Sequence, residues 1–361
     1  MTHDTFSTEI DPGTFDIQNG TGARQSRPAS VTAVVCVYNE ARWISLKQTI
    51  EAVLYQIRCD DEFLVIVDHN DTLLERCRAQ FATLKVIANH HARGLSGARN
   101  TAIEEAHGSI LAFIDDDATP LDGWLDALRA PYADEWVYGV GGLAKPDWFS
   151  GQPGWFPQEF LWVVGCSHLG LPPHTQAVRN IVGANMSFRK SAFDHVGGFA
   201  EEMGRIGERL HGCEETEFSI RLTRANPHAI ILYDPSSQVE HHLAAQRASL
   251  RYFIRRCWAE GLSKSEVSRR VGSSSGLSAE RHYASRVLPR GIRKGLVDSI
   301  AGDIWGAARS AVILLGLFVT AAGYGVGTLC RPLITADRME PLCHSFQLAE
   351  VVPVSRDSIV V

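Results

Sequence analysis

The chain has 361 residues, of which 45% are hydrophobic and 21% charged, which is typical of a folded protein of one large or two modest domains. Its formal net charge of −6 argues against a nucleic-acid-binding protein, which normally has a strongly basic domain. The charge is uneven: residues 251–300 hold eleven Lys and Arg against four Asp and Glu, about +7, leaving about −13 for the remainder.

The first segment of the chain is polar. Residues 1–29 lack the basic and then apolar pattern of a signal peptide, so we expect a disordered leader. The eight cysteines show no CxxC pair and no zinc-like spacing. In a chain of this length they are expected to be reduced thiols, which indicates a reducing compartment.

Short apolar runs alternate with helical stretches from residue 30 onward. Four runs are almost wholly apolar, as expected of strands buried on both faces: 31–37, 63–67, 84–88 and 110–114. Between them, 41–56 and 95–107 have helical periodicity, and Gly108 suits a helix end. This alternation predicts an α/β fold with a mainly parallel sheet over about residues 30–130.

Polar residues follow each of the predicted strands. Ligands of parallel sheets bind beyond the carboxyl ends of the strands, which share one edge. The residues expected at that edge are Tyr38, Asn39, Glu40, Asp68 and the three aspartates 115–117. An acid such as Asp68 could accept hydrogen bonds from a ribose or a base, although a single Asp is also common in turns.

The stretch "LAFIDDDATP" places Asp115, Asp116 and Asp117 directly after a buried strand. Carboxylates two residues apart can both reach a hard divalent cation, and Mg²⁺ and Mn²⁺ share such ligands with substrate phosphates. A solvated turn or a phosphate-accepting aspartate pocket are the alternatives. The triplet is therefore a candidate metal site.

Two later motifs add candidate site residues. "HGCEETEFSIRL" puts Glu214, Glu215 and Glu217 at a probable helix start, where acids stabilise the helix dipole or, if one faces the reaction centre, act as a general base. "VEHHL" follows a strand predicted at 229–233, and one of its histidines could complete a metal shell. Taken alone, helix stabilisation is favoured for the glutamates, and a structural or surface role is the commoner one for a histidine pair.

Two further segments bear on the acceptor and on the membrane. Residues 145–165 are rich in Trp, Phe, Pro and Gly, which fits either a core or a surface that covers a sugar or a lipid. Residues 245–300 are predicted to be helical and basic. The next segment, 310–329, contains no charge and is long enough to span a bilayer, although a buried hairpin would also explain it.

Seven short motifs occur in the order seen in family 2 glycosyltransferases, and together they resemble that family from about residue 31 to 265. They are "VTAVVCVYNEARWI", "LVIVDHNDT", "RGLSGARNTAI", "ILAFIDDDATP", "GANMSFRKSAFDHVGGF", "GCEETEFSIRL" and "VEHH". The resemblance implies the Rossmann-like GT-A fold of nucleotide-diphospho-sugar transferases, with a C-terminal helical extension.

The resemblance also implies roles for particular residues. Asp115 and Asp117 would hold Mn²⁺ or Mg²⁺ against the diphosphate, with His241, or His242 beside it, as a further ligand. The nucleotide sugar would be contacted by Tyr38, Asn39, Glu40, Asp68, Arg99, Asp115 and Asp116. Glu214 and Glu215 match the acidic pair whose second member is the catalytic base; here it is Glu where Asp is commoner.

The implied activity is direct displacement with inversion, moving one sugar from a nucleotide-diphosphate sugar, expected to be a UDP-sugar, to a glycan or lipid-linked acceptor. The Q-x-x-R-W signature of processive relatives is absent near 255–265, which predicts transfer of a single residue. Candidate acceptor residues are Trp155, Trp162, Asn185 and Trp258.

The expected organisation is a leader (1–29), a catalytic domain (30–245) with nucleotide (30–130) and acceptor (131–245) halves, a basic helical extension (246–335) and a tail (336–361). The basic stretch before the apolar segment favours an anionic membrane on its cytoplasmic face, by a peripheral contact or one transmembrane segment. An inactive membrane-associated scaffold and a sugar-phosphate nucleotidyltransferase are the alternatives. Because the acidic motifs are intact and no Gly-rich basic loop follows the first strand, both rank second.

Overall fold

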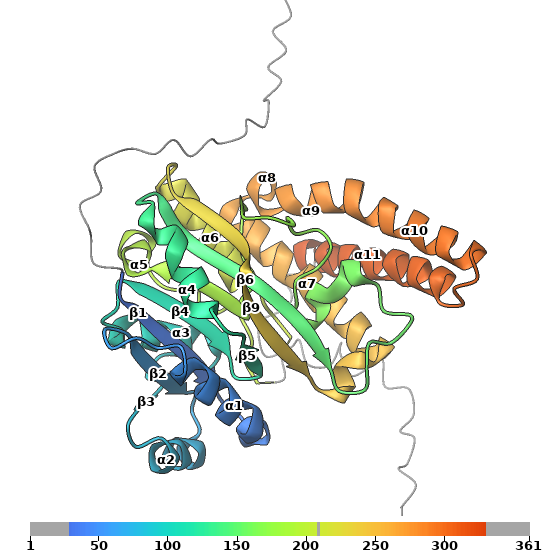
Figure 1. The fold of residues 1–361 in the computed structure, drawn as a ribbon. Helices are drawn as coiled ribbons and strands as arrows, with labels where there is room; N and C mark the ends of the chain where they lie inside the picture. Colours follow the sequence, from blue (N-terminus) through green and yellow to red (C-terminus); the bar gives the residue numbers. More distant parts are fainter. Residues whose placement is uncertain (1–28, 208–209, 330–361) are drawn as a thin grey trace, which may run out of the picture.

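A computed structural model describes residues 29–207 and 210–329. Nearly all of the leader expected at 1–29, and the whole tail expected at 336–361, lie outside these residues. The described chain builds one mixed β-sheet covered by helices, with further helices at one end (Figure 1).

Four parallel strands form the first half of the sheet. They are β1 (Val31–Val37), β2 (Glu62–Val67), β3 (Lys85–Ala88) and β4 (Ile110–Asp115). Their order is β3-β2-β1-β4, so β1 pairs with both β2 and β4. This half confirms the strands predicted from the apolar runs, because apolar residues on both faces of each strand are covered by helices.

The second half of the sheet is mixed in direction. Its strands are β5 (Ala118–Pro120), β6 (Val137–Trp148), β7 (Gln176–Ala177), β8 (Asn185–Arg189) and β9 (Ile230–Leu243). The order continues β4-β8-β6-β9-β5, with β8 antiparallel to β4 and to β6. The strand predicted at 229–233 is much longer because β9 pairs with β6 on one side and with β5 and β7 on the other.

Helices cover both faces of the sheet. The α-helices are α1 (Trp43–Leu54), α2 (Asp71–Gln80), α3 (Leu95–Glu105), α4 (Trp124–Arg129), α5 (Lys190–Val196) and α6 (Glu214–Ala225). Short 3-10 turns are η1 (Glu40–Arg42), η2 (Ala130–Ala133) and η3 (Gln158–Val164).

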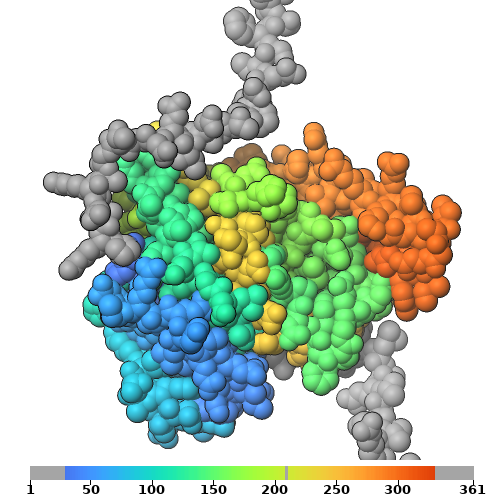
Figure 2. All heavy atoms as spheres, viewed as in Figure 1, coloured from blue at the N-terminus to red at the C-terminus, as the bar shows by residue number. Residues whose placement is uncertain are grey.

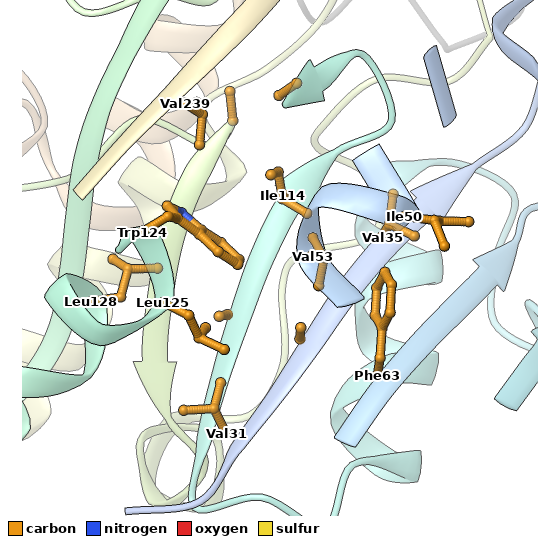
Figure 3. Packing of buried hydrophobic residues seen from close by; sticks show 14 of the residues in the cluster. Val31, Val35, Ile50, Val53, Phe63, Ile114, Trp124, Leu125, Leu128 and Val239 are labelled. Atoms are coloured by element: carbon orange, nitrogen blue, oxygen red, sulfur yellow. The ribbon is translucent and has the colours of Figure 1, made fainter. Parts of the chain in front are cut away.

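The core has one hydrophobic layer on each face of the sheet. In β1, Val35 packs with Ile50 and Val53 of α1. The preceding residue, Val34, faces the opposite layer, which lies under α3, α5 and α6. Figure 3 shows the first layer, where Trp124 of α4 fills the space beside β4. Since successive strand residues point to opposite faces, an unbroken apolar run satisfies both layers.

Seven elements form the C-terminal helical extension. They are η4 (Ala245–Ala248), α7 (Leu250–Val271), α8 (Ser273–Gly276), α9 (Ser278–His282), the π-helical turn η5 (Tyr283–Val287), α10 (Leu288–Ile300) and α11 (Gly306–Leu329). This extension, orange in Figure 2, lies at the end of the molecule away from the blue first half of the sheet. The helical extension is thus confirmed, and the apolar segment predicted at 310–329 is part of a longer helix.

The extension is docked on the aromatic segment of the chain. Phe156 and Phe160 pack with Phe253 of α7 and Ile313 of α11 in a third hydrophobic core. Helix α11 also lies so close to α7 that a Cβ on Gly261 would be 2.2 Å from the Thr320 carbonyl oxygen. The aromatic segment is therefore largely core, and it joins the sheet to the extension.

Candidate functional site

The aspartate triplet lies at the shared edge where β1, β2 and β4 end. Asp115 is the last residue of β4 and pairs with Cys36 of β1. Asp116 and Asp117 are buried in the turn to β5, whereas Asp115 is part-exposed. The predicted clustering at the carboxyl edge thus follows from the parallel topology, and two of three like charges are removed from water.

Asp117 sits in a buried cluster with a histidine and two arginines. Its Oδ1 is 3.0 Å from His241 Nε2 and its Oδ2 is 3.0 Å from Arg247 Nη2, with Arg42 Nη1 at 3.3 Å. Burial would raise the pKa of Asp117, but the fields of His241, Arg247 and Arg42 outweigh it and hold that pKa well below its ordinary value. Asp117 is therefore ionised.

Asp116 has a different environment. It is paired with Arg42, but its Oδ2 has no hydrogen-bond partner in the described part of the chain. Burial, only partly offset by Arg42 and reinforced by the charge of Asp117, raises the pKa of Asp116 to about 7. An orphaned buried carboxylate oxygen of this kind indicates that a cationic or proton-donating group belongs nearby.

Three side chains of the site fit a divalent cation. One ligand atom from each of Asp115, Asp117 and His241 lies within 4.8 Å of the others. Two carboxylates and an imidazole suit Mn²⁺, and carboxylate oxygens also suit Mg²⁺. His242, the other candidate, points to the opposite side of β9, where its Nδ1 is 2.7 Å from Asp147.

Asp68 is fixed at the end of β2 by the loop after β3. Its Oδ1 accepts a hydrogen bond of 2.7 Å from Asn89 and is 2.9 Å from His69 Nδ1, while its Oδ2 accepts one of 2.9 Å from the Gly94 backbone NH. A small pocket is lined by Tyr38, Asp68 and Asp115 among others. Asn39 and Glu40 are exposed beside it, and the Asn39 side chain caps η1.

The acidic pair begins α6, as predicted, and Arg99 ties it to the aspartate triplet. Arg99 is 2% exposed; its Nη1 is 2.7 Å from Glu214 Oε1 and its Nη2 is 3.6 Å from Asp115 Oδ1. Arg99 therefore bridges two acids of the site, and its contact with the nucleotide sugar stays a prediction. That bridge positions the start of α6 against the end of β4.

Glu215 lines a cavity at the start of α6. Burial, and then repulsion from Glu214, raise the pKa of Glu215 to about 8. A carboxyl group with a pKa near the working pH can accept a proton in one step and release it later. The residue before the pair, Cys213, has a left-handed φ of 71°, which makes the chain turn sharply into α6.

The cavity has a volume of about 520 Å³ and lies between the sheet edge and the C-terminal helices. Asp115 and Glu215 line it on the sheet side, Trp162 and Arg256 on the extension side, and Leu317 of α11 at its apolar wall. It has the size, the apolar lining and the few convergent polar groups of a substrate site.

Only one of the four predicted acceptor residues lines this cavity. Trp162 does so. Asn185 is 0% exposed and donates to the Ser237 carbonyl while accepting from Trp124, so its polar groups are used within the core. Trp155 packs in the third core, and Trp258 lies on α7 against Gly323 of α11. Packing explains the side chains of Asn185 and Trp155, whereas the contact of Trp258 with Gly323 is made by its backbone carbonyl.

Two charged residues of the site could not be predicted from the sequence, because no local pattern marks them. Arg42 and Arg247 are single arginines in ordinary surroundings, and only the fold brings both to Asp117. Arg256, Glu260 and Lys264 do show a signal, because their i, i+4 spacing puts them on one face of α7. A solvated helix face would show the same spacing.

Comparisons with known proteins agree with this geometry. The family described as glycosyl transferase family 2 matches residues 32–197. A glucosyl-dolichyl phosphate glucuronosyltransferase from Haloferax volcanii is 33% identical over 238 residues, covering 65% of this chain and 76% of that protein. A pre-mycofactocin glycosyltransferase from Mycobacterium tuberculosis is 30% identical over 232 residues, 63% of this chain and 45% of the relative.

A solved structure shares the fold. The mannosyltransferase PcManGT from Pyrobaculum calidifontis, solved in complex with GDP-Man and Mn²⁺, superposes with a TM-score of 0.52 at 16% identity. The match covers 82% of this chain and 88% of that chain. At this identity the likeness establishes the architecture, and it extends into the C-terminal part of the chain.

Proposed function

The chain belongs to glycosyltransferase family 2, and from this premise we propose that it transfers one sugar, with inversion, from a nucleotide-diphosphate sugar to an acceptor hydroxyl. The observation that carries the proposal is the position of Glu215: it faces a cavity of substrate size beside Asp115 and the metal-ligand set. In this proposal the base, the donor pocket and the acceptor space meet at one edge of the sheet.

The residues proposed to bind the donor lie at or near the carboxyl ends of the strands. Asp115, Asp117 and His241 would hold Mn²⁺ or Mg²⁺, which supplies Lewis-acid stabilisation of the departing diphosphate. Asp68, held by Asn89 and Gly94, would accept hydrogen bonds from the nucleoside. We propose a UDP-sugar as the donor.

The residue proposed to activate the acceptor, Glu215, lies on α6. Glu215 would accept the proton of the acceptor hydroxyl as its oxygen attacks the anomeric carbon, and the bond to the diphosphate oxygen breaks in the same step. Arg99 neutralises Glu214, so that one carboxylate of the pair is committed to structure and the other remains available. No covalent sugar–enzyme intermediate is required.

The function is tested by thermal unfolding of the full chain with UDP, GDP and dTDP, each with and without Mn²⁺. We expect one diphosphate to raise the melting temperature only with metal, because binding to the folded state alone shifts the unfolding equilibrium. Release of the same diphosphate from its sugar conjugate should then identify the donor. If no diphosphate stabilises the protein, the scaffold alternative takes precedence.

We also propose that the acceptor is lipid-linked and that the α10–α11 hairpin lies on the membrane surface. Helix α11 is the one described helix long and apolar enough to cross a bilayer. One flank of α11 is covered by α7, which carries many charged residues. Because those charges would not enter the bilayer, we expect α11 to lie in the plane of the membrane interface. Nucleotide sugars would reach the enzyme from the cytoplasmic side.

The hairpin has the two kinds of surface that such a contact needs. Large apolar side chains are exposed along it: Leu296, Val297, Ile300, Ile304, Trp305, Leu314 and Phe318. Exposed cations on α10 stand beside them: Arg290, Arg293 and Lys294. Apolar burial together with attraction to anionic lipid is how interfacial helices bind. Figure 1 shows this hairpin projecting from the end of the molecule.

Replacing Leu314 and Phe318 together by Ser should weaken binding to vesicles that contain phosphatidylglycerol by about tenfold or more, since each large side chain contributes roughly 1.5–3 kcal/mol on burial. Vesicle flotation measures the effect. Tyr55→Ser removes an equally exposed aromatic residue at the far end of α1 and should change nothing. Equal flotation of both variants would contradict the membrane contact.

A further inference from the structure

One part of the large cavity has a cluster of charged residues, which we call the cationic corner. It consists of Arg179, Arg256, Glu260, Lys264 and Glu280, all of which line the cavity. Arg256 and Lys264 are only 9% and 8% exposed. Charges buried to this extent are normally matched one for one, because an unmatched buried charge is costly.

The cationic corner holds more positive than negative charge. Glu280 accepts two hydrogen bonds from Arg179, of 2.6 and 2.7 Å, and lies 2.7 Å from Lys264 Nζ. Glu260 is 2.9 Å from Arg256 Nη1 and 3.5 Å from Lys264 Nζ. Three cations therefore share two carboxylates, which leaves one positive charge uncompensated within the cluster.

Two neighbouring groups, His168 and Cys213, add no charge to this cluster, and Glu215 is neutral while it holds its proton. Burial, and then the field of Lys264, lower the pKa of His168 to about 4, so its imidazole is neutral near pH 7. Cys213 donates its thiol hydrogen to Glu260, at 3.2 Å, and burial raises the pKa of that thiol well above its ordinary value. Both groups line the cavity without adding charge.

Arg256 also has an unused donor. Nη1 is ion-paired with Glu260 at 2.9 Å, and Nε has no hydrogen-bond partner among residues 29–207 and 210–329. The guanidinium lies 6.0 Å from the ring of Trp162, which also lines the cavity. Buried guanidinium donors normally find an acceptor, so a ligand that supplies one fits this position.

The cationic corner is next to both the base and the apolar wall. Lys264 and Glu260 are close enough to Glu215 to influence its charge, and Cys213, which contacts Glu260, is two residues before Glu215. The wall beside the corner is formed by Phe160, Trp162, Leu171, Val287, Leu288 and Leu317. The last of these belongs to α11, the helix with the exposed apolar face.

We propose that the cationic corner binds a phosphate group of the acceptor, the anionic link between its reacting sugar or alcohol and an apolar chain. Arg256 donates to the phosphate oxygens, the apolar chain follows the wall toward α11, and the acceptor hydroxyl reaches Glu215. This inference rests on the proposed function and adds to it the chemical class of the acceptor. Arg256 is assigned as a specificity-determining residue.

The test compares citronellyl phosphate with citronellol, its uncharged counterpart, as ligands of the full chain saturated with Mn²⁺ and the stabilising nucleoside diphosphate, so that the donor pocket is filled. Calorimetry should give at least tenfold tighter binding of the phosphate. In Arg256→Gln the ratio should fall to within about threefold, because Gln keeps no charged donor for the phosphate oxygens. Arg255→Gln removes the neighbouring exposed arginine and should keep the ratio.

Three results would overturn the inference. They are equal binding of the two ligands by the unmodified chain, an unchanged ratio in Arg256→Gln, and binding of inorganic phosphate as tight as that of citronellyl phosphate. The last would mean that the cationic corner takes free phosphate. Metal-dependent stabilisation by the diphosphate serves as the folding control for both variants. If that stabilisation is absent from the unmodified chain, the proposed function itself fails.

Discussion

Replacing Glu215 by Gln should lower kcat by about 10²–10⁴, the range expected for loss of a general base. The substitution keeps the size and hydrogen-bonding capacity of the side chain but removes its ability to accept the acceptor proton. Nucleotide binding should be unchanged, because Glu215 lies on the cavity side of the site. The measurement is steady-state release of nucleoside diphosphate with saturating donor and acceptor.

The pH dependence of this reaction provides an independent check. Because the base must be deprotonated and the pKa of Glu215 is raised to about 8, kcat/KM of the unmodified enzyme should rise with pH up to about 8. The rise should be absent in Glu215→Gln. Glu215→Asp restores a carboxylate of the kind commoner in the family and should recover part of the activity and the pH-dependent rise.

The same residue should oppose folding at alkaline pH. The pKa of Glu215 is about 8 when folded, above the ordinary value of 4.5, so the folded state holds a proton that the unfolded state has lost. Stability from this group therefore falls as pH rises from about 4.5 to about 8. Glu215→Gln should melt at a higher temperature than the unmodified protein at pH 8.

The catalytic prediction has its own contrary outcome. A kcat of Glu215→Gln within tenfold of that of the unmodified enzyme would exclude Glu215 as the base.

Replacing Asp117 by Asn should abolish the Mn²⁺-dependent part of nucleotide binding and reduce turnover to near background. Asp117 is the buried carboxylate of the metal-ligand set, and Asn carries no charge with which to hold the cation. The measurement is the shift in melting temperature caused by nucleoside diphosphate at increasing Mn²⁺. Asp122→Asn, on the exposed turn before α4, removes one nearby acid as the matched control.

Asp117 also has a structural role that must be separated from metal binding. It is the partner of buried Arg247, and removing one member of a buried ion pair costs about 3–5 kcal/mol. Asp117→Ala should therefore be strongly destabilised, whereas Asn retains an acceptor for Arg247 and should be less so. Unchanged Mn²⁺ dependence in a folded Asp117→Asn variant would place the metal elsewhere.

The sequence by itself determined the strands and the edge at which the site forms. Short apolar runs that alternate with helical stretches indicate strands covered on both faces, and parallel strands bring their carboxyl ends together. Tyr38, Asp68 and Asp115 were therefore predicted at one edge before their contacts were known. The start of α6 at Glu214 followed from local chemistry, because acids stabilise the first turn of a helix.

Only the tertiary structure decided which of several equivalent residues act. His241 rather than His242 faces Asp117 because alternate residues of β9 point to opposite sides. Asn185 was predicted at the acceptor and instead bonds within the core. The pairing of β8 with β4 and β6, and of β9 with β6 and β5, sets all three positions, and no local pattern encodes that long-range pairing.

The same holds for the charged residues of the extension. Arg255 and Arg256 are adjacent and chemically identical in the sequence, yet only Arg256 lines the cavity, because α7 packs against α11 and the aromatic core. Composition could show that this stretch is basic and that residues 310–329 are apolar. Which charges are buried, and what they face, depends on the packing of helices far apart in the chain, and that is a property of the folded molecule alone.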